Sequence, residues 1–556
     1  MRKRLVIAVL ALLLAACGST SDDTADTATD SGTDTAVEET ASDLTMADVS
    51  PDLSLEVGAE VMADVLPDIV EEFPPRGLPF EFKRTDKGDP IPADETTQFT
   101  RKVTGIWKKA GWARWLLRTS TGVDPTTGKE DYLAWYNDVK AIKEGDTVTF
   151  QQTGGDHNQW IAGSKILSQA MGGCALTGEW DMCKLAEQYC KGLTASVKGF
   201  VWDENDPAKY LMARAVFPMD QEFTLDEETW QDDGRKKNVV FSSMYKEEHG
   251  WNAHTFEWPH NPTWGYMYVT NMRSKDDVCA ITRTTTFLAY MVADAPYPWV
   301  AEACQETLET MQGFNKDIVE YDYNMRTKGA DGVAYIDTEQ DLGSYNWYTP
   351  IDENNECTAR LATDLIAHGE RLTNDCGNGF GSLFEDIAAA GHYYNYPILW
   401  GYHMAALGHA MMYGHDDMAW ELLYGMALRM DDYLDPNTSQ PGADDHAWDR
   451  DMAVLLVQAA SMGLPLTSKE GRLIQKHFNH AVGEWDAFAN WDLWDASVPD
   501  GEYSAGSGFR PPSTDEGIHR DSIAIFLEYC NSPFQNSHGR PFVDCAVVAD
   551  PTQWGE

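Results

Sequence analysis

Apolar residues three or four positions apart recur along residues 97 to 530, and this spacing limits the possible folds more than any other feature. It gives each helix an apolar side that neighbouring helices must cover. The spacing predicts eleven helices, over Thr97–Thr119, Gln159–Met171, Asp181–Lys198, Asp277–Val292, Trp299–Val319, Cys357–Leu372, Ile398–Tyr413, Met418–Tyr433, Ala447–Met462, Lys469–Val482 and Gly517–Tyr529. Strand-like segments are few, mainly Thr147–Gln152, Asn238–Phe241 and Val333–Ile336. The chain is therefore predicted to be mainly helical.

The predicted helices are of two kinds. Asp181–Lys198 and Met418–Tyr433 follow short turns and carry more charge than the others. Gln159–Met171, Asp277–Val292 and Ile398–Tyr413 are apolar nearly all round, so each is expected to be buried on every side. Alternating buried and half-exposed helices favour an inner ring of helices wrapped by an outer ring. A solenoid is the alternative, but the chain lacks the fixed repeat of about 34 to 47 residues that solenoids show.

This alternation resembles the six-hairpin, or (α/α)6-toroid, proteins, which include many glycoside hydrolases and polysaccharide lyases. The most specific part of the resemblance is the segment Asn271–Val278, the buried helix that follows it, the turn Ala295-Pro296, the outer helix 299–319 and Asp331-Gly332. The resemblance implies an all-α, (α/α)6-toroid-like barrel over residues 97–556, with long aromatic-rich loops, a few short strands and a site at the inner-helix starts. No catalytic motif of these families is matched residue by residue, so no particular reaction is implied.

The N-terminus has the parts of an export signal in the usual order. Residues 1–17 contain three basic residues, then the apolar stretch Leu5–Leu14, which is too short to cross a bilayer core of about 30 Å. The sequence Leu14-Ala-Ala-Cys17 resembles the lipobox of bacterial lipoproteins, in which the cysteine is lipidated after the signal is removed. The resemblance implies a palmitate-type lipid anchor at Cys17. Gly18, in place of an aspartate, favours the outer membrane of the cell envelope.

Charge divides the chain into a tether and a folded part. Residues 18–72 contain 16 acidic residues and no lysine or arginine, which predicts a disordered acidic tether. Residues 73–96 are rich in proline, glycine and charge and are interpreted as a linker or arm. The whole chain has 89 acidic and 42 basic residues, a net charge of −47. A chain this acidic is a poor candidate for nucleic-acid binding, which needs a basic surface.

Nine cysteines follow Cys17, and an exported protein can form disulfides. Cys530 and Cys545 flank a short loop containing proline and glycine, and we expect them to pair. Cys357 with Cys376 is the second expected pair. The remaining pairings are left open, and an odd number leaves at least one thiol. The cysteine spacings do not fit a zinc site.

Clusters of polar and aromatic residues precede five of the predicted helices. In a toroid these clusters would meet at one rim and line a ligand-binding depression, which we call the cup. Single acids at helix starts are ordinary caps, but caps do not require neighbouring histidine, tyrosine, tryptophan and arginine. The clusters contain Asp156, His157, Asn158, Trp160, Arg273, Asp276, Asp277, His392, Tyr394, His446, Trp448, Asp449, Glu516 and His519. Long loops over residues 200–270 and 484–514 are predicted to cover the rim, and the first supplies Trp251, Asn252, His254 and Trp258. Aromatic rings stack on sugar faces, so a glycan ligand is expected.

Glycoside hydrolysis needs two carboxyl groups that flank the bond. Asp277 and Asp449 are the first choice, with Glu516 and Asp156 as the other catalytic candidates. A polysaccharide lyase is the first alternative, and its roles would be filled by His254, Tyr394, Asn158 and Arg273. A non-catalytic ligand-binding or structural lipoprotein is the second. No cofactor is required, although the acidic segments Asp203–Asp206 and Asp352–Glu356 have a composition compatible with calcium.

Overall fold

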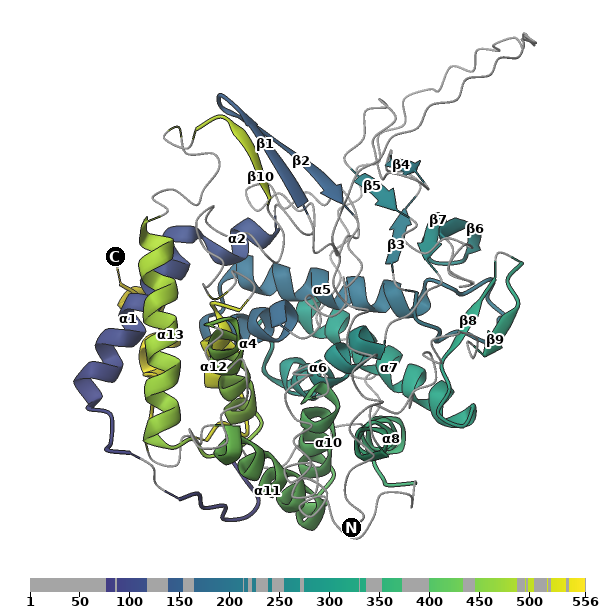
Figure 1. Cartoon of the computed structure of the whole chain (residues 1–556). Coiled ribbons are helices and arrows are strands. Elements are labelled where there is room, and N and C mark those ends of the chain that lie inside the picture. Colours follow the sequence, from purple (N-terminus) through teal and green to yellow (C-terminus); the bar gives the residue numbers. More distant parts are fainter. Residues whose placement is uncertain are drawn as a thin grey trace, which may run out of the picture. The chain divides into compact units, whose positions relative to one another are not determined.

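The computed structural model describes residues 77–85, 88–117, 139–153, 165–213, 215–218, 223–226, 239–242, 255–270, 275–329, 331–336, 353–372, 400–433, 446–487, 496, 499–504, 518, 522–536 and 540–555. Within these ranges the chain is mainly helical, as the spacing predicted (Figure 1). The helices are α1 (Ala93–Ala110), α2 (Trp112–Leu116), α4 (Leu167–Thr177), α5 (Trp180–Lys198), α6 (Lys275–Asp294), α7 (Pro298–Glu320), α8 (Glu353–His368), α10 (Trp400–Met412), α11 (Asp416–Tyr433), α12 (His446–Ser461), α13 (Ser468–Ala487), α14 (Ile525–Asn531), α15 (Cys545–Val548) and the 3-10 turn η6 (Pro551–Gln553).

Each predicted helical segment overlaps a helix of the structure, with one break that the spacing did not predict. The segment Thr97–Thr119 is divided at Gly111, which has a φ of 53° and donates its N–H to the carbonyl of Lys108. A left-handed residue ends a helix because its backbone turns out of the helical path, and glycine adopts this conformation without strain. The chain therefore forms α1 and α2 here instead of one long helix.

Consecutive helices form hairpins joined by short turns: α4 with α5, α6 with α7, α10 with α11, and α12 with α13. Gly178, in the turn between α4 and α5, has a φ of 67°. The first helices of these hairpins, together with α14, contact one another: α4 lies against α6 and α14, α6 against α10, and α12 against α14. Helices α5, α7 and α8 form a second series of contacts.

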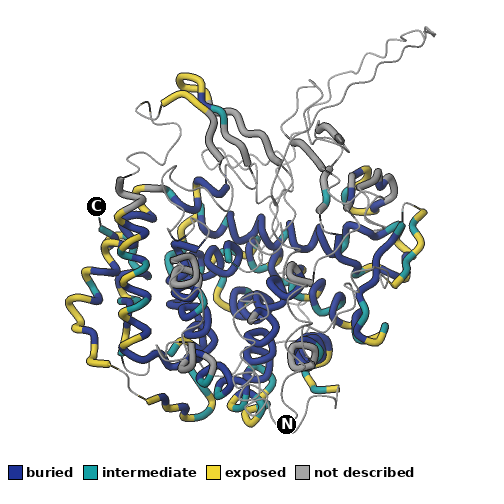
Figure 2. Tube along the Cα trace, viewed as in Figure 1, coloured by how far each residue is buried: buried dark blue, intermediate teal, exposed yellow. Residues whose placement is uncertain are grey.

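Small residues allow α6 and α10 to approach closely. A Cβ atom at Gly401 would overlap the carbonyl oxygen of Cys279, and one at Gly408 would lie 2.6 Å from the Oγ1 atom of Thr286. Since position 279 faces 401 and position 286 faces 408, the two helices run in the same direction. Their central residues are buried (Figure 2).

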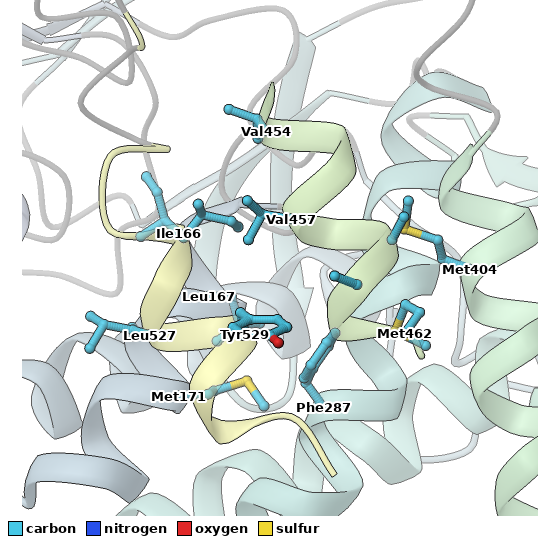
Figure 3. Packing of buried hydrophobic residues seen from close by; sticks show 14 of the residues in the cluster. Ile166, Leu167, Met171, Phe287, Met404, Val454, Val457, Met462, Leu527 and Tyr529 are labelled. Carbon is cyan, nitrogen blue, oxygen red and sulfur yellow. The ribbon is translucent and has the colours of Figure 1, made fainter. Parts of the chain in front are cut away.

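Apolar side chains fill the space between these helices (Figure 3). Leu167 comes from α4, Phe287 from α6, Met404 from α10, Val457 from α12 and Tyr529 from α14, and all five are at most 4% exposed. Burying side chains of this size contributes about 1.5–3 kcal/mol each. The main core therefore lies between the first helices of the hairpins and α14.

The segment 200–270 is not the long loop that we predicted. Its described part contains the short strands β3 (Ala215–Pro218), β4 (Phe223–Asp226), β5 (Val239–Ser242), β6 (Thr255–Asn261) and β7 (Gly265–Thr270). The other described strands are β1 (Val139–Glu144), β2 (Thr147–Thr153), β8 (Arg326–Lys328), β9 (Ala334–Ile336) and β10 (Gly501–Ser504). The three predicted strands correspond to β2, β5 and β9. Part of the second predicted loop, 484–514, belongs to α13 and β10. Strands of four to seven residues have too few alternations to be recognised beside aromatic-rich segments.

The strands pair into three sheets. One sheet has the order β10-β1-β2-β5-β4, with β1 antiparallel to β2 and β10, and β5 parallel to β2 and β4. The second has the order β3-β7-β6 and is antiparallel, and the third pairs β8 with β9. Three strands precede a core helix in the chain: β2 comes before α4, β7 before α6, and β10 before α14.

Residues 77–85 and 88–92, within the predicted linker or arm, pack on the helices. The Arg84 guanidinium forms an ion pair with Glu470 of α13, with 2.7 Å between Nη1 and Oε1, and both side chains are almost fully buried. Phe82 and Ile91 belong to the main core. A buried ion pair with flanking apolar contacts fixes this segment to the start of α13.

Three disulfides lie within the described residues. Cys530 pairs with Cys545, as predicted. The pairings left open are resolved as Cys174 with Cys183, which closes the α4–α5 hairpin, and Cys190 with Cys304, which joins α5 to α7. Cys279 is buried on α6 outside these disulfides. The predicted pair of Cys357 with Cys376 involves side chains outside the described part of the chain, as does Cys17.

Candidate functional site

The predicted cup depends on the connections that lead into α4, α6, α10, α12 and α14. Most of its residues lie outside the described ranges, namely Asp156, His157, Asn158, Trp160, Trp251, Asn252, His254, Arg273, His392, Tyr394, Glu516 and His519. Their predicted roles are untested by the structure. The described residues near the predicted cup are those at the helix starts and in the core between the helices.

Five of the predicted site residues lie in the first turns of two helices. Asp276 and Asp277 follow Lys275, the first residue of α6, and His446, Trp448 and Asp449 begin α12. The first turn of a helix has unpaired backbone N–H groups and a positive end of the helix dipole, both of which stabilise a carboxylate. The two aspartates proposed as the catalytic pair thus each occupy a helix start.

Trp258 is the exception among the predicted ligand-binding residues, because its side chain is described and it is fully buried. It lies on β6, donates its Nε1–H to the carbonyl of Val201 at 3.1 Å, and contacts Phe200 and Trp202 with ring centroids 5.5 and 4.9 Å away. A ring enclosed in this way has no face for a sugar. We therefore correct this prediction: Trp258 anchors the β6–β7 hairpin to the residues that follow α5.

A buried ion pair and a serine join three core helices, close to the starts of α4 and α14 and at the ninth residue of α6. Arg283 of α6 donates from Nη1 to Oε1 of Glu528 at 2.7 Å and from Nη2 to Oε2 at 3.0 Å. The hydroxyl of Ser168 donates to the same carboxylate. Ser168 is the second residue of α4 and Glu528 the fourth residue of α14. The side chains of Arg283 and Glu528 are at most 1% exposed.

This arrangement holds α4, α6 and α14 in one relative position. A bidentate arginine–carboxylate pair fixes both distance and orientation, and the hydroxyl adds a third helix to the same carboxylate. This group was not predicted from the sequence. Its signal was present as single charged residues within segments that are otherwise apolar, such as Arg283 in Asp277–Val292.

Two histidines of α10 belong to the core. His403 Nε2 lies 2.9 Å from the carbonyl oxygen of Leu422, and His409 Nε2 lies 2.7 Å from the hydroxyl of Thr285. Burial lowers the pKa of His409 to about 3, because the fully buried imidazole has no water to solvate its charged form. His409 is therefore neutral at physiological pH and serves as a hydrogen-bonding group between α6 and α10.

In the first acidic segment considered for calcium, Asp203–Asp206, the carboxylate of Asp206 is already paired with a lysine. Asp206 accepts hydrogen bonds from the backbone N–H groups of Trp202 and Ala208 and forms an ion pair with Lys328. The carboxylate is buried and fully engaged, so calcium would have to displace a cation. In the second segment, residues 353–356 begin α8. Among the residues the structure describes, no group of three or more histidine, cysteine, aspartate or glutamate side chains could hold a metal ion.

No family model matches this chain, and no curated protein or solved structure matches it. Within the described ranges, no helix combines the length and apolar composition needed to cross a bilayer.

Proposed function

We propose that this chain is an exported lipoprotein, anchored through Cys17 to the outer membrane, whose helices form an (α/α)-toroid with a glycan-directed cup. In this proposal α4, α6, α10, α12 and α14 are the inner helices. The four hairpins, the common direction of α6 and α10, and the contacts that connect the first helices of the hairpins support this arrangement.

The buried group of Ser168, Arg283 and Glu528 carries the placement of the cup. It joins three proposed inner helices within a few residues of the starts of α4 and α14. If this buried group forms the floor of the cup, the connections that follow β2, β7 and β10 would line its wall. These connections contain Asp156, Arg273 and Glu516. A rigid floor beneath variable connections is the arrangement that a catalytic or binding site requires.

The proposed reaction is hydrolysis of a neutral glycan by Asp277 and Asp449. One carboxyl group, in its protonated form, would donate a proton to the leaving oxygen, and the other would act as a base or nucleophile. Carboxyl groups about 5–5.5 Å apart give retention at the sugar carbon, and groups about 6.5–9.5 Å apart give inversion. The strongly acidic surface disfavours a polyanionic substrate, which makes the lyase reaction the alternative.

Thermal unfolding of the purified full chain with a panel of neutral glycans and uronates tests the cup. A ligand at one hundred times its dissociation constant stabilises a protein by about 2.7 kcal/mol. Asp277→Asn and Asp449→Asn should abolish product release. Asp417→Asn is the matched control, because Asp417 lies exposed in the first turn of α11.

The outcomes separate the alternatives. Release of reducing sugar that requires both aspartates supports the hydrolase, and an unsaturated uronate product supports the lyase. Stabilisation without any product supports a non-catalytic glycan-binding protein. If no glycan stabilises the chain, the glycan-directed cup is rejected. Mass analysis of the mature N-terminus tests the anchor separately, since lipidation adds acyl chains to Cys17.

A further inference from the structure

The outer side of α1 carries basic residues on an otherwise acidic protein. Arg101, Lys102, Lys108 and Lys109 are all exposed. Lys108 follows Arg101 by seven positions, and Lys109 follows Lys102 by seven, so the four side chains lie on one side of the helix. The acidic residues of this helix, Asp94 and Glu95, are confined to its first turn.

Helix α13 continues this basic surface. Lys469, Arg472, Lys476 and His480 are exposed and follow one another at intervals of three or four residues. From the start of α13 to His480 the only acidic residue is Glu470, which is buried against Arg84.

The two helices lie side by side (Figure 1). Arg472 pairs with Glu95 at 3.1 Å, and Lys102 Nζ donates to Asn479 Oδ1 at 3.1 Å. Because 95 faces 472 and 102 faces 479, the helices run in the same direction and their basic rows merge. We call this surface the α1/α13 basic face, defined by Arg101, Lys102, Lys108, Lys109, Lys469, Arg472, Lys476 and His480.

Helix stability accounts for only part of the basic face. Lys108 and Lys109 lie in the last turn of α1, where a cation is stabilised by the negative end of the helix dipole. Lys469 lies in the first turn of α13, where the positive end of the dipole destabilises a cation, and Arg472 lies beyond that turn. A chain with 89 acidic and 42 basic residues has thus gathered several of its cations on one surface.

We propose that the α1/α13 basic face binds the anionic lipid headgroups of the membrane to which the chain is anchored. This inference rests on the lipid anchor of the proposed function. Basic clusters are attracted to anionic lipid surfaces, and the attraction acts within about 8 Å at physiological ionic strength. The anionic membrane repels the strongly acidic remainder of the domain. The domain is therefore oriented with the α1/α13 basic face toward the membrane.

The chain that comes from Cys17 first meets the described domain at Gly77 and Leu78, which contact Pro533 and Gly463. It reaches the start of α13 only at Gly88, which lies against Ser468 and Lys469, and Arg540 Nη1 donates to the Gly88 carbonyl at 3.1 Å. The anionic membrane is therefore chosen for the sign of its charge and for its presence beside an anchored domain, and not for the point at which the chain enters.

Lysine footprinting on vesicles tests the proposal. The purified full-length protein is mixed with neutral phosphatidylcholine vesicles or with vesicles containing phosphatidylglycerol, and an amine reagent that does not cross membranes is added. Labelling of Lys102, Lys108 and Lys476 should slow several-fold on the anionic vesicles relative to the neutral ones, and salt should reverse the difference. Lys209 and Lys316 are exposed internal controls whose labelling should not change.

Two double variants with equal loss of charge complete the test. Lys102→Gln with Lys108→Gln should reduce the protection of Lys476, whereas Lys209→Gln with Lys316→Gln should not. Equal labelling on both vesicle types, or equal slowing at all lysines, would overturn the proposal. Slowing by soluble polyphosphate but not by anionic vesicles would also overturn it and assign the face to a soluble polyanion. Failure to bind neutral vesicles would instead reject the lipid anchor.

Discussion

Removing one partner of the ion pair between Arg283 and Glu528 should be among the most destabilising single substitutions in the described core. Both side chains are at most 1% exposed, and two charge-assisted hydrogen bonds of 2.7 and 3.0 Å connect them. Such bonds contribute about 1.5–3 kcal/mol each. Removing one partner also leaves a buried charge uncompensated, and measured losses for such changes are about 3–5 kcal/mol. Glu528→Leu should therefore lower the free energy of unfolding by about 3–5 kcal/mol.

Urea unfolding followed by circular dichroism measures this loss. The double variant Arg283→Met with Glu528→Leu should recover much of it, because no unpaired charge remains. Glu306→Leu is the matched control: Glu306 pairs with Lys198 between α5 and α7 at 3.0 Å but is 57% exposed, so its loss should stay below about 1 kcal/mol. If Glu528→Leu also costs less than about 1 kcal/mol, or if the double variant is as unstable as the single one, the role assigned to the pair is wrong.

Three further predictions follow from the core. Burial lowers the pKa of His409 from 6.5 to about 3, so between these pH values the unfolded chain binds one more proton than the folded chain. The free energy of unfolding should therefore fall by up to about 1.4 kcal/mol per pH unit as the pH drops from 6.5 to 3. Urea unfolding at several pH values measures this slope, and His409→Leu should remove the part that His409 contributes. Gly401→Ala should lower the free energy of unfolding by about 1–3 kcal/mol, because the added methyl group forces α10 away from α6. Gly483→Ala on α13, where the space around the Cβ position is open, should raise it by up to about 1 kcal/mol. Equal shifts of the melting temperature in the two variants would contradict the close approach of α6 and α10. Replacing Cys190 and Cys304 by serine opens a loop of 114 residues and should lower the free energy of unfolding by about 4–5 kcal/mol relative to the oxidised parent. An unchanged unfolding midpoint would exclude the disulfide between these cysteines.

Helix positions were predictable because the relevant information is local. Spacing of apolar residues located every segment that became a described helix from α1 to α14, and the short loop between Cys530 and Cys545 indicated their disulfide. The break at Gly111 was missed, because a single glycine inside a long apolar pattern is compatible with continuation or with termination. Helix ends were also misplaced, since the predicted helix Gly517–Tyr529 begins only at Ile525 and the predicted helix Cys357–Leu372 ends at His368.

The candidate site was predictable only as far as helix starts. The sequence placed Asp277 and Asp449 at the beginnings of helices, and the structure places both in first turns. The sequence could not distinguish a tryptophan that contacts a ligand from one that packs in the protein core. Trp258 was assigned to the first group, and its burial against Phe200 assigns it to the second.

Local pattern by itself thus determined that the chain is mainly helical, that α4, α6 and α10 are buried, and where acids and aromatics precede them. It did not determine the burial of α5, which was expected to be half-exposed and has no exposed residue from Asp181 to Lys198. Tertiary structure alone decided that Arg283, Glu528 and Ser168 meet, that Cys190 pairs with Cys304, and that two separate basic rows form one face on α1 and α13. The physical reason is separation along the chain. Backbone and side-chain preferences act over a few residues, whereas a contact between residues hundreds of positions apart forms only when the packing of intervening helices brings them together.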